Sequence, residues 1–226
     1  RQLERLPRIL PTPVGTTFFR QSRENIMKTT VTCSPLLKEP ELKKAPIIVR
    51  VNEFNNKAAK EFAAQISAAH NTGQSVIPVI IDSYGGQVYS LMAMISSIRH
   101  AELPVATIIE GKAMSCGAIL FSFGDENMRF MDPDATLMIH DVSSSVWGKV
   151  EELKADTAEA ERLNQTVYKM MARNCGKKDD YFLEHMHALG HADWFLDAAD
   201  AKKHNLANQI RVPKFNITVN VNIDFE

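Results

Sequence analysis

Cysteine is scarce in this chain of 226 residues, which contains only Cys33, Cys116 and Cys175. Their number is odd and their spacing matches no paired pattern, which argues against a disulfide-stapled scaffold. Cysteine without disulfides is typical of a reducing compartment, so we predict a cytoplasmic protein.

Long apolar runs and an excess of charge are also missing. No apolar run approaches the roughly 20 residues that a membrane-spanning helix needs. The formal net charge is −1, and the basic residues are spread along the chain. This balance gives no electrostatic basis for binding nucleic acid or an anionic membrane, so neither is a predicted partner.

Motifs for a bound nucleotide or metal are missing as well. The phosphate-binding pattern Gly-x-x-x-x-Gly-Lys-Ser/Thr does not occur in the sequence. His185, His187 and His191 are close in sequence, but the first two would lie on different faces of a helix. No cysteine pattern accompanies them, so we predict no metal site.

Short apolar runs alternate with helical patterns between residues 46 and 140. The runs predict strands at Pro46–Val51, Val76–Asp82, Val105–Glu110, Asn127–Met131 and Ala135–His140. The helices between them are expected from a cap at Asn55 to near Gly73, over Val88–His100 and over Ser115–Phe123, with Gly111–Ser115 as a turn. This alternation predicts βα units and a largely parallel sheet, and therefore an α/β fold.

The pattern changes at Val150. From there to Met170 apolar residues recur every three or four positions, which predicts one helix of roughly 25 residues that ends at Gly176. A stripe this regular needs a partner surface. Shorter helices should follow, one capped by Asp179 or Asp180 and one capped by Asp197 and closed by Asn205 in a left-handed conformation.

The two ends of the chain differ from its centre. Residues 1–44 have no sustained periodicity and are interpreted as an arm with a possible short strand at Thr30–Cys33. Apolar and polar residues alternate strictly from Phe215 to Phe225, which predicts a half-buried strand. That strand could be an edge of the chain's own fold or could pair with a neighbouring subunit. We therefore divide the chain into residues 1–44, 45–212 and 213–226.

Several residues have the chemistry that acyl transfer needs. Ser115 lies among small residues at a strand-to-helix turn, where backbone N–H groups can approach a substrate. Gly86 ends a Gly-Gly pair after a buried strand, His140 ends another strand, and Asp193 precedes an aromatic segment. Taken singly, such residues are more often a helix cap, a tight turn, a structural histidine and a turn aspartate.

Taken together, these segments resemble the Clp peptidase family. The resemblance covers about residues 46–208, and it is carried by Ser83–Gly86, Gly111–Ala118, Met138–His140 and Asp193–Leu196. These segments are similar to the family's Ser-Pro-Gly-Gly, Gly-x-Ala-x-Ser-x-Gly-Ala, Met-Ile-His and Asp-x-Phe motifs. His140 follows Ser115 by 25 residues (140 − 115), which is the family's usual spacing. Four motifs in this order are far more specific than any one of them.

The resemblance implies a crotonase-like fold of stacked ββα units with an extended handle helix at about residues 149–173. It also implies a serine endopeptidase with Ser115 as nucleophile, His140 as base and Asp193 as the residue that orients the base. The N–H groups of Gly86 and Cys116 would form the oxyanion hole. No cofactor or metal is implied.

The family also suggests the partners. Peptides or unfolded proteins would be the substrates. The chain would form stacked rings, which have seven subunits each in the family, and the handle helices of the two rings would meet. An ATPase unfoldase would deliver protein substrates. Phage head-maturation peptidases share these motifs, so a viral role is an alternative.

Three departures from the family pattern stand near the motifs. Tyr84 replaces the proline before the Gly-Gly pair, Asp141 follows His140 where Gln or Asn is usual, and Ala192 replaces a common arginine. Because alanine offers no donor and His191 before it is a weaker, pH-dependent substitute, we expect Asp193 to be held by packing of Trp194 and Phe195 or by the C-terminal strand.

Two other functions are alternatives to the peptidase hypothesis. A catalytically silent subunit of a Clp-like assembly is one, although such subunits typically lack a residue of the Ser–His–Asp set. An acyl-CoA enzyme of the crotonase type is the other, and coenzyme A binding would reveal it.

Overall fold

The computed structural model describes residues 16–18, 28–31, 45–143 and 147–219. The chain divides into two compact units, one of residues 1–45 with 214–226 and one of residues 46–213. The expected site residues all lie in the larger unit.

The smaller unit contains a three-stranded sheet. β1 (Thr16–Phe18) pairs antiparallel with β2 (Lys28–Val31), and β10 (Asn216–Val219) pairs parallel with β2. β2 thus starts two residues before the expected strand, and Cys33 lies outside the described residues. The expected C-terminal strand is seen over the four residues of β10, which pairs with β2 of the same chain. Residues 220–226 lie outside the described part.

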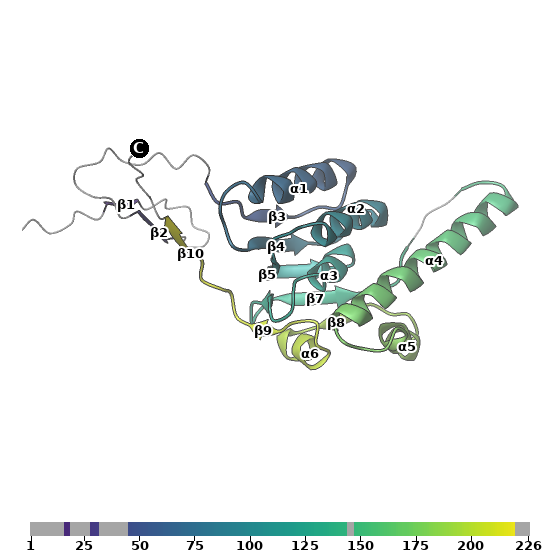
Figure 1. Ribbon diagram of the computed structural model, residues 1–226. Helices are drawn as coiled ribbons and strands as arrows, with labels where there is room; N and C mark the ends of the chain where they lie inside the picture. Colours follow the sequence, from purple (N-terminus) through teal and green to yellow (C-terminus); the bar gives the residue numbers. More distant parts are fainter. Residues whose placement is uncertain (1–15, 19–27, 32–44, 144–146, 220–226) are drawn as a thin grey trace, which may run out of the picture. The chain divides into compact units, whose positions relative to one another are not determined.

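The larger unit is an α/β structure around a seven-stranded sheet (Figure 1). Its strands are β3 (Val49–Val51), β4 (Ile77–Ser83), β5 (Val105–Met114), β6 (Arg129–Met131), β7 (Thr136–Ile139), β8 (Trp194–Leu196) and β9 (Gln209–Ile210). Every pairing is parallel except that between β7 and β8. The predicted parallel sheet is therefore confirmed, with β8 and β9 as strands that the sequence patterns did not indicate.

Three helices lie along one side of this sheet (Figure 1). They are α1 (Asn56–Ala69), α2 (Val88–Arg99) and α3 (Cys116–Phe121). α1 begins where expected because the side chain of Asn55 accepts a hydrogen bond from the Ala58 N–H at 2.8 Å. β4 is buried throughout Ile77–Ile81, as its continuous apolar run predicted.

β5 corrects one expectation. The sequence predicted a strand that ends at Glu110 and a turn over Gly111–Ser115. The strand instead continues to Met114, because Lys112 to Met114 pair with Thr136 to Met138 of β7. The turn is therefore concentrated at Ser115, which immediately follows the strand.

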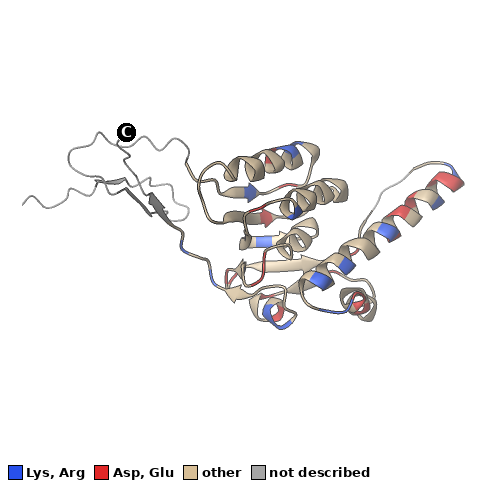
Figure 2. Ribbon diagram, in the orientation of Figure 1, with Lys and Arg blue, Asp and Glu red and all other residues tan. Residues whose placement is uncertain are grey.

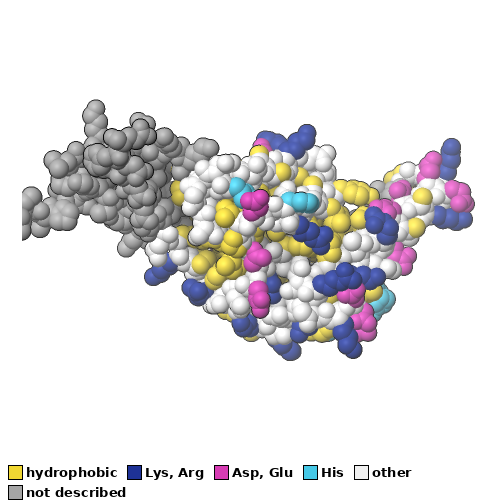
Figure 3. Space-filling view, viewed as in Figure 1, with side chains coloured by type: hydrophobic (Ala, Val, Ile, Leu, Met, Phe, Trp, Pro, Cys, Tyr) yellow, Lys and Arg dark blue, Asp and Glu magenta, His cyan; other side chains and the backbone are white. Residues whose placement is uncertain are grey.

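The long helix α4 spans Val150–Asn174, which is 25 residues, and Gly176 follows it in a left-handed conformation as predicted. Its buried residues occur only from Leu163 onward, whereas residues 150–158 are all exposed. This exposed half extends away from the sheet, and charged side chains of both signs cover it (Figures 2 and 3). The apolar stripe therefore has a partner within the described chain along its second half only.

Two short helices complete the unit, α5 (Tyr181–Ala188) and α6 (Ala198–Lys203). Asp197 caps α6 as predicted, accepting a hydrogen bond from the Asp200 N–H at 2.8 Å, and Asn205 follows with a φ of 60°. Asp180 occupies the cap position of α5, but its side chain accepts no capping hydrogen bond.

The two caps give a matched test of helix capping. We expect Asp197→Ala to lower the free energy of unfolding by about 1 kcal/mol, since the helix loses a side-chain acceptor for an N-terminal N–H group. Asp180→Ala removes the same charge at the same helix position but no capping bond, so its effect should be clearly smaller. Guanidinium midpoints at one protein concentration measure both, and equal shifts would contradict the assignment.

Candidate active site

The segments that carry Ser115, His140 and Asp193 meet at the ends of three neighbouring strands. β5 ends beside β7, where Met114 pairs with Met138 and the Ser115 N–H donates to the Met138 carbonyl at 2.9 Å. β7 in turn pairs with β8 through Ile139 and Trp194. Ser115, His140 and Asp193 are therefore the residues next to these three strand ends. The sheet register brings together residues from segments that are far apart in the sequence.

Ser115 has a strained backbone. Its φ is 56° and its ψ is −120°, a conformation that non-glycine residues rarely adopt, and it lies between β5 and α3. In α/β-hydrolases, a serine on such a sharp strand-to-helix turn presents its hydroxyl outward. Gly85 leaves room for this turn: a Cβ there would lie 2.6 Å from the Ser115 Cβ and 3.1 Å from its Oγ.

Gly86 and Cys116 are linked directly. The Cys116 Sγ donates a hydrogen bond to the Gly86 carbonyl oxygen at 3.3 Å, and Gly86 forms a bridge with Phe54. A Cβ on Gly86 would lie 2.5 Å from the Phe54 oxygen, so only glycine fits there. Burial raises the pKa of the Cys116 thiol to about 11, which keeps it protonated at neutral pH and leaves the residue's backbone N–H as its expected contribution.

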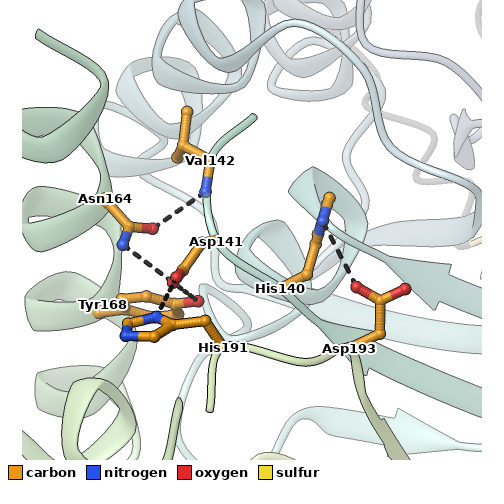
Figure 4. Close-up of polar contacts among 7 residues, drawn as sticks. All are labelled: His140, Asp141, Val142, Asn164, Tyr168, His191 and Asp193. Atoms are coloured by element: carbon orange, nitrogen blue, oxygen red, sulfur yellow. Dashed lines mark hydrogen bonds and ion pairs between the residues drawn. The ribbon is translucent and has the colours of Figure 1, made fainter. Parts of the chain in front are cut away.

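His140 and Asp193 face each other across the β7–β8 edge (Figure 4). The His140 Nδ1 lies 3.9 Å from the Asp193 Oδ1, within the range of an ion pair but longer than a hydrogen bond. The exposed fraction of the side chain is 27% for His140 and 55% for Asp193. In the single chain the pair is thus open to solvent and slightly apart.

A second polar cluster lies beside this pair (Figure 4). The Asp141 Oδ1 accepts hydrogen bonds from the Asn164 Nδ2 at 2.9 Å and the Tyr168 hydroxyl at 3.0 Å. Its Oδ2 contacts the His191 Nδ1 at 2.5 Å. Burial opposes ionisation of Asp141, but these hydrogen bonds together lower the pKa of its carboxyl below its ordinary value. Burial, followed by the nearby Asp141 charge, raises the pKa of Tyr168.

Aromatic packing holds the residue that follows Asp193. Trp194 stacks on His185 with ring centroids 5.2 Å apart and an interplanar angle of 10°, and meets His204 edge-on at 4.9 Å. Burial lowers the pKa of His204, which favours a neutral ring in this cluster. Packing of Trp194 was expected, but Phe195 is 57% exposed and does not share that role.

The sequence patterns gave no role to Asn164 or Tyr168. Both fit the helical stripe and could be interpreted only as positions on a long helix. Their contacts with Asp141 bridge 23 and 27 residues of sequence, so only the fold reveals them. A polar residue within an otherwise apolar stripe was the one available signal.

Within the described residues, no group of three His, Cys, Asp or Glu side chains is arranged to hold a metal ion. In that same part of the chain, no helix is long and apolar enough to cross a membrane. Cys116 and Cys175 are both free and buried.

Comparison with known proteins agrees with these motifs. A profile of the Clp protease family matches residues 38–214. One similar relative is the ATP-dependent Clp protease proteolytic subunit of Deinococcus radiodurans, which is 29% identical over 134 residues. The match covers 59% of this chain and 64% of that relative, so the chain spans less than two thirds of the relative's length.

The Gly85 contact can be tested against another glycine. Gly85→Ala and Gly73→Ala both place a side chain at positive φ, but only the first Cβ meets other atoms, at 2.6 Å from Ser115. Overpacking of this kind costs about 1–3 kcal/mol, so Gly85→Ala should be destabilised by that much more than Gly73→Ala. Denaturant unfolding compares the two variants, and equal losses of stability would refute the close approach.

Proposed function

The chain belongs to the Clp protease family, and on that basis we propose that it is a serine endopeptidase that uses Ser115, His140 and Asp193. The observation that carries this proposal is the convergence of the three residues at the β5, β7 and β8 ends. The strained backbone of Ser115 supports it further, because strained residues cluster at active sites.

The reaction is acyl transfer. His140 takes the proton from the Ser115 hydroxyl as the oxygen attacks the peptide carbonyl, and the same proton then passes to the leaving amine. Water hydrolyses the acyl-enzyme in the reverse sequence of proton transfers. Asp193 orients His140 and stabilises its charged form, which requires the 3.9 Å separation to shorten to a hydrogen bond. This mechanism uses no metal or cofactor.

The tetrahedral intermediate needs donors for its oxyanion. We assign this role to the N–H groups of Gly86 and Cys116. The hydrogen bond from the Cys116 Sγ to the Gly86 carbonyl oxygen, at 3.3 Å, supports the assignment, since it fixes the two residues relative to each other. Preorganised donors stabilise the transition state because they need no reorganisation when charge develops.

A second copy of the chain is proposed to cover the exposed half of α4. At this end Trp147 is 99% exposed and Val150 is 66% exposed, which is unusual for apolar side chains. Contact between handle helices of stacked rings, seven-membered in the family, would bury them and enclose the active sites. An ATPase unfoldase would then deliver unfolded proteins into the chamber. A cytoplasmic location stays a prediction from the cysteine content.

The nucleophile is tested by Ser115→Ala with Ser96→Ala as control. Ser96 is exposed on α2, away from the strand ends, so its loss should leave hydrolysis of a short fluorogenic peptide unchanged. Ser115→Ala should lower the rate by several orders of magnitude while the native mass stays the same. Persistent hydrolysis by Ser115→Ala would refute the assignment, and binding of coenzyme A by an inactive wild type would favour the crotonase alternative.

The enclosed chamber is tested by substrate size. The assembled chain should hydrolyse short peptides without ATP but leave a stably folded protein intact, because only an extended chain could enter. Gel electrophoresis of a folded substrate incubated with the purified chain measures this directly. Digestion of the folded protein without a partner would contradict an enclosed site.

A further inference from the structure

Two histidine–carboxylate pairs connect the same two segments, in opposite senses. In the proposed catalytic pair, the end of β7 supplies the histidine and the segment before β8 supplies the carboxylate, at 3.9 Å. In the neighbouring pair, β7 is followed by the carboxylate of Asp141 and the segment before β8 supplies His191, at 2.5 Å. The pair without a role in the chemistry is therefore the one with the tighter contact (Figure 4).

The Asp141–His191 contact lies where it can control the spacing of the catalytic pair. Asp141 is the next residue after His140, and His191 is two residues before Asp193. One end of the loop is fixed by the C-terminal cap of α5, where the His191 N–H donates to the Met186 carbonyl at 2.9 Å. Its other end enters β8. Between these two fixed points, the His191 side chain is a tether from the loop to Asp141.

The backbone of His191 is unusual as well. Its φ is 60°, a left-handed conformation that is uncommon outside glycine but that histidine, like asparagine and aspartate, adopts more often than most residues. The hydrogen bond with Asp141 holds the side chain of a residue in this conformation.

Asp141 is also fixed from the side of α4. Tyr168 is only 1% exposed, and its hydroxyl and the Asn164 amide both donate to the same carboxylate oxygen. Asn164 additionally accepts from the Val142 N–H at 3.1 Å, which holds the backbone just after Asp141. The carboxylate therefore joins three elements: the end of β7, the helix α4 and the loop before β8.

From this geometry we propose that Asp141 and His191 are positioning residues that set the alignment of His140 with Asp193 and tie it to the position of α4. The inference rests on the proposed peptidase function. Since the exposed half of α4 is the surface assigned to a second copy, a shift of this helix on assembly would reach the catalytic pair through Asn164 and Tyr168.

His191→Asn and His191→Asp form the decisive pair of variants. Asparagine and aspartate are alike in size, and both tolerate left-handed backbone. Asparagine keeps an N–H donor near the position of the imidazole Nδ1, whereas aspartate places a second carboxylate against Asp141. His191→Asp should lower kcat by roughly 10- to 100-fold with little change in KM, as expected of a small misplacement near the chemistry. His191→Asn should retain most of the wild-type kcat.

Two further variants separate positioning from general damage. Tyr168→Phe removes one hydroxyl donor to Asp141 without changing packing volume, so it should also lower kcat rather than raise KM. His187→Asn is the control, because its ring contacts His191 edge-on at 4.6 Å but lies outside the Asp141 cluster. Native mass must be unchanged for each variant. Equal kcat for His191→Asp and His191→Asn, or full activity of Tyr168→Phe, would overturn the proposal.

Hydrogen exchange of residues 189–196 provides a readout that does not need activity. Exchange should be faster in His191→Asp than in wild type, while His191→Asn should match wild type. If the wild type hydrolysed no peptide, the peptidase function would fail, but this comparison would still decide whether the tether holds the loop. Unchanged exchange in His191→Asp would overturn the positioning role even in an active enzyme.

Discussion

The register of β7 against its two neighbours is the constraint on which the rest of the site depends. The Ser115 N–H bonds the Met138 carbonyl on one side, and Ile139 pairs with Trp194 on the other. A slip of one residue would exchange the two faces of β7. Leu137 and Ile139 are buried, so a slip would turn them toward the less protected face and cost much of their burial energy. Core packing therefore fixes where His140 emerges.

Backbone strain and close packing determine the structure of the site around Ser115. The left-handed conformation of Ser115 costs about 1–3 kcal/mol, which the structure around it must offset. β5 and the buried helix α3 hold the residue from both directions, and Gly85 leaves the space that the turn needs. The same packing sets the Cys116 thiol against the Gly86 carbonyl. The proposed oxyanion donors are thus placed by backbone contacts, whereas His140 and Asp193 depend on side-chain contacts.

Much of this architecture could be predicted from the sequence, because the parallel sheet is built from continuous apolar runs such as Ile77–Ile81. The predicted end of β5 was wrong, because Gly111 and the small residues after it resemble a turn until the pairing with β7 is known. β8 is three residues long and leaves no periodic pattern. The Asp141 cluster was beyond local patterns for a different reason: its members meet only after three distant segments have folded together.

We expect one reactive serine at the junction of β5 and α3, with its base just after β7. The most direct measurement is reaction of the purified full chain with a fluorophosphonate probe, followed by mass spectrometry of the labelled peptide. We expect a single adduct on Ser115 that forms in the wild type and is largely lost in His140→Gln. An adduct on another residue, no adduct at all, or equal labelling of His140→Gln would contradict it.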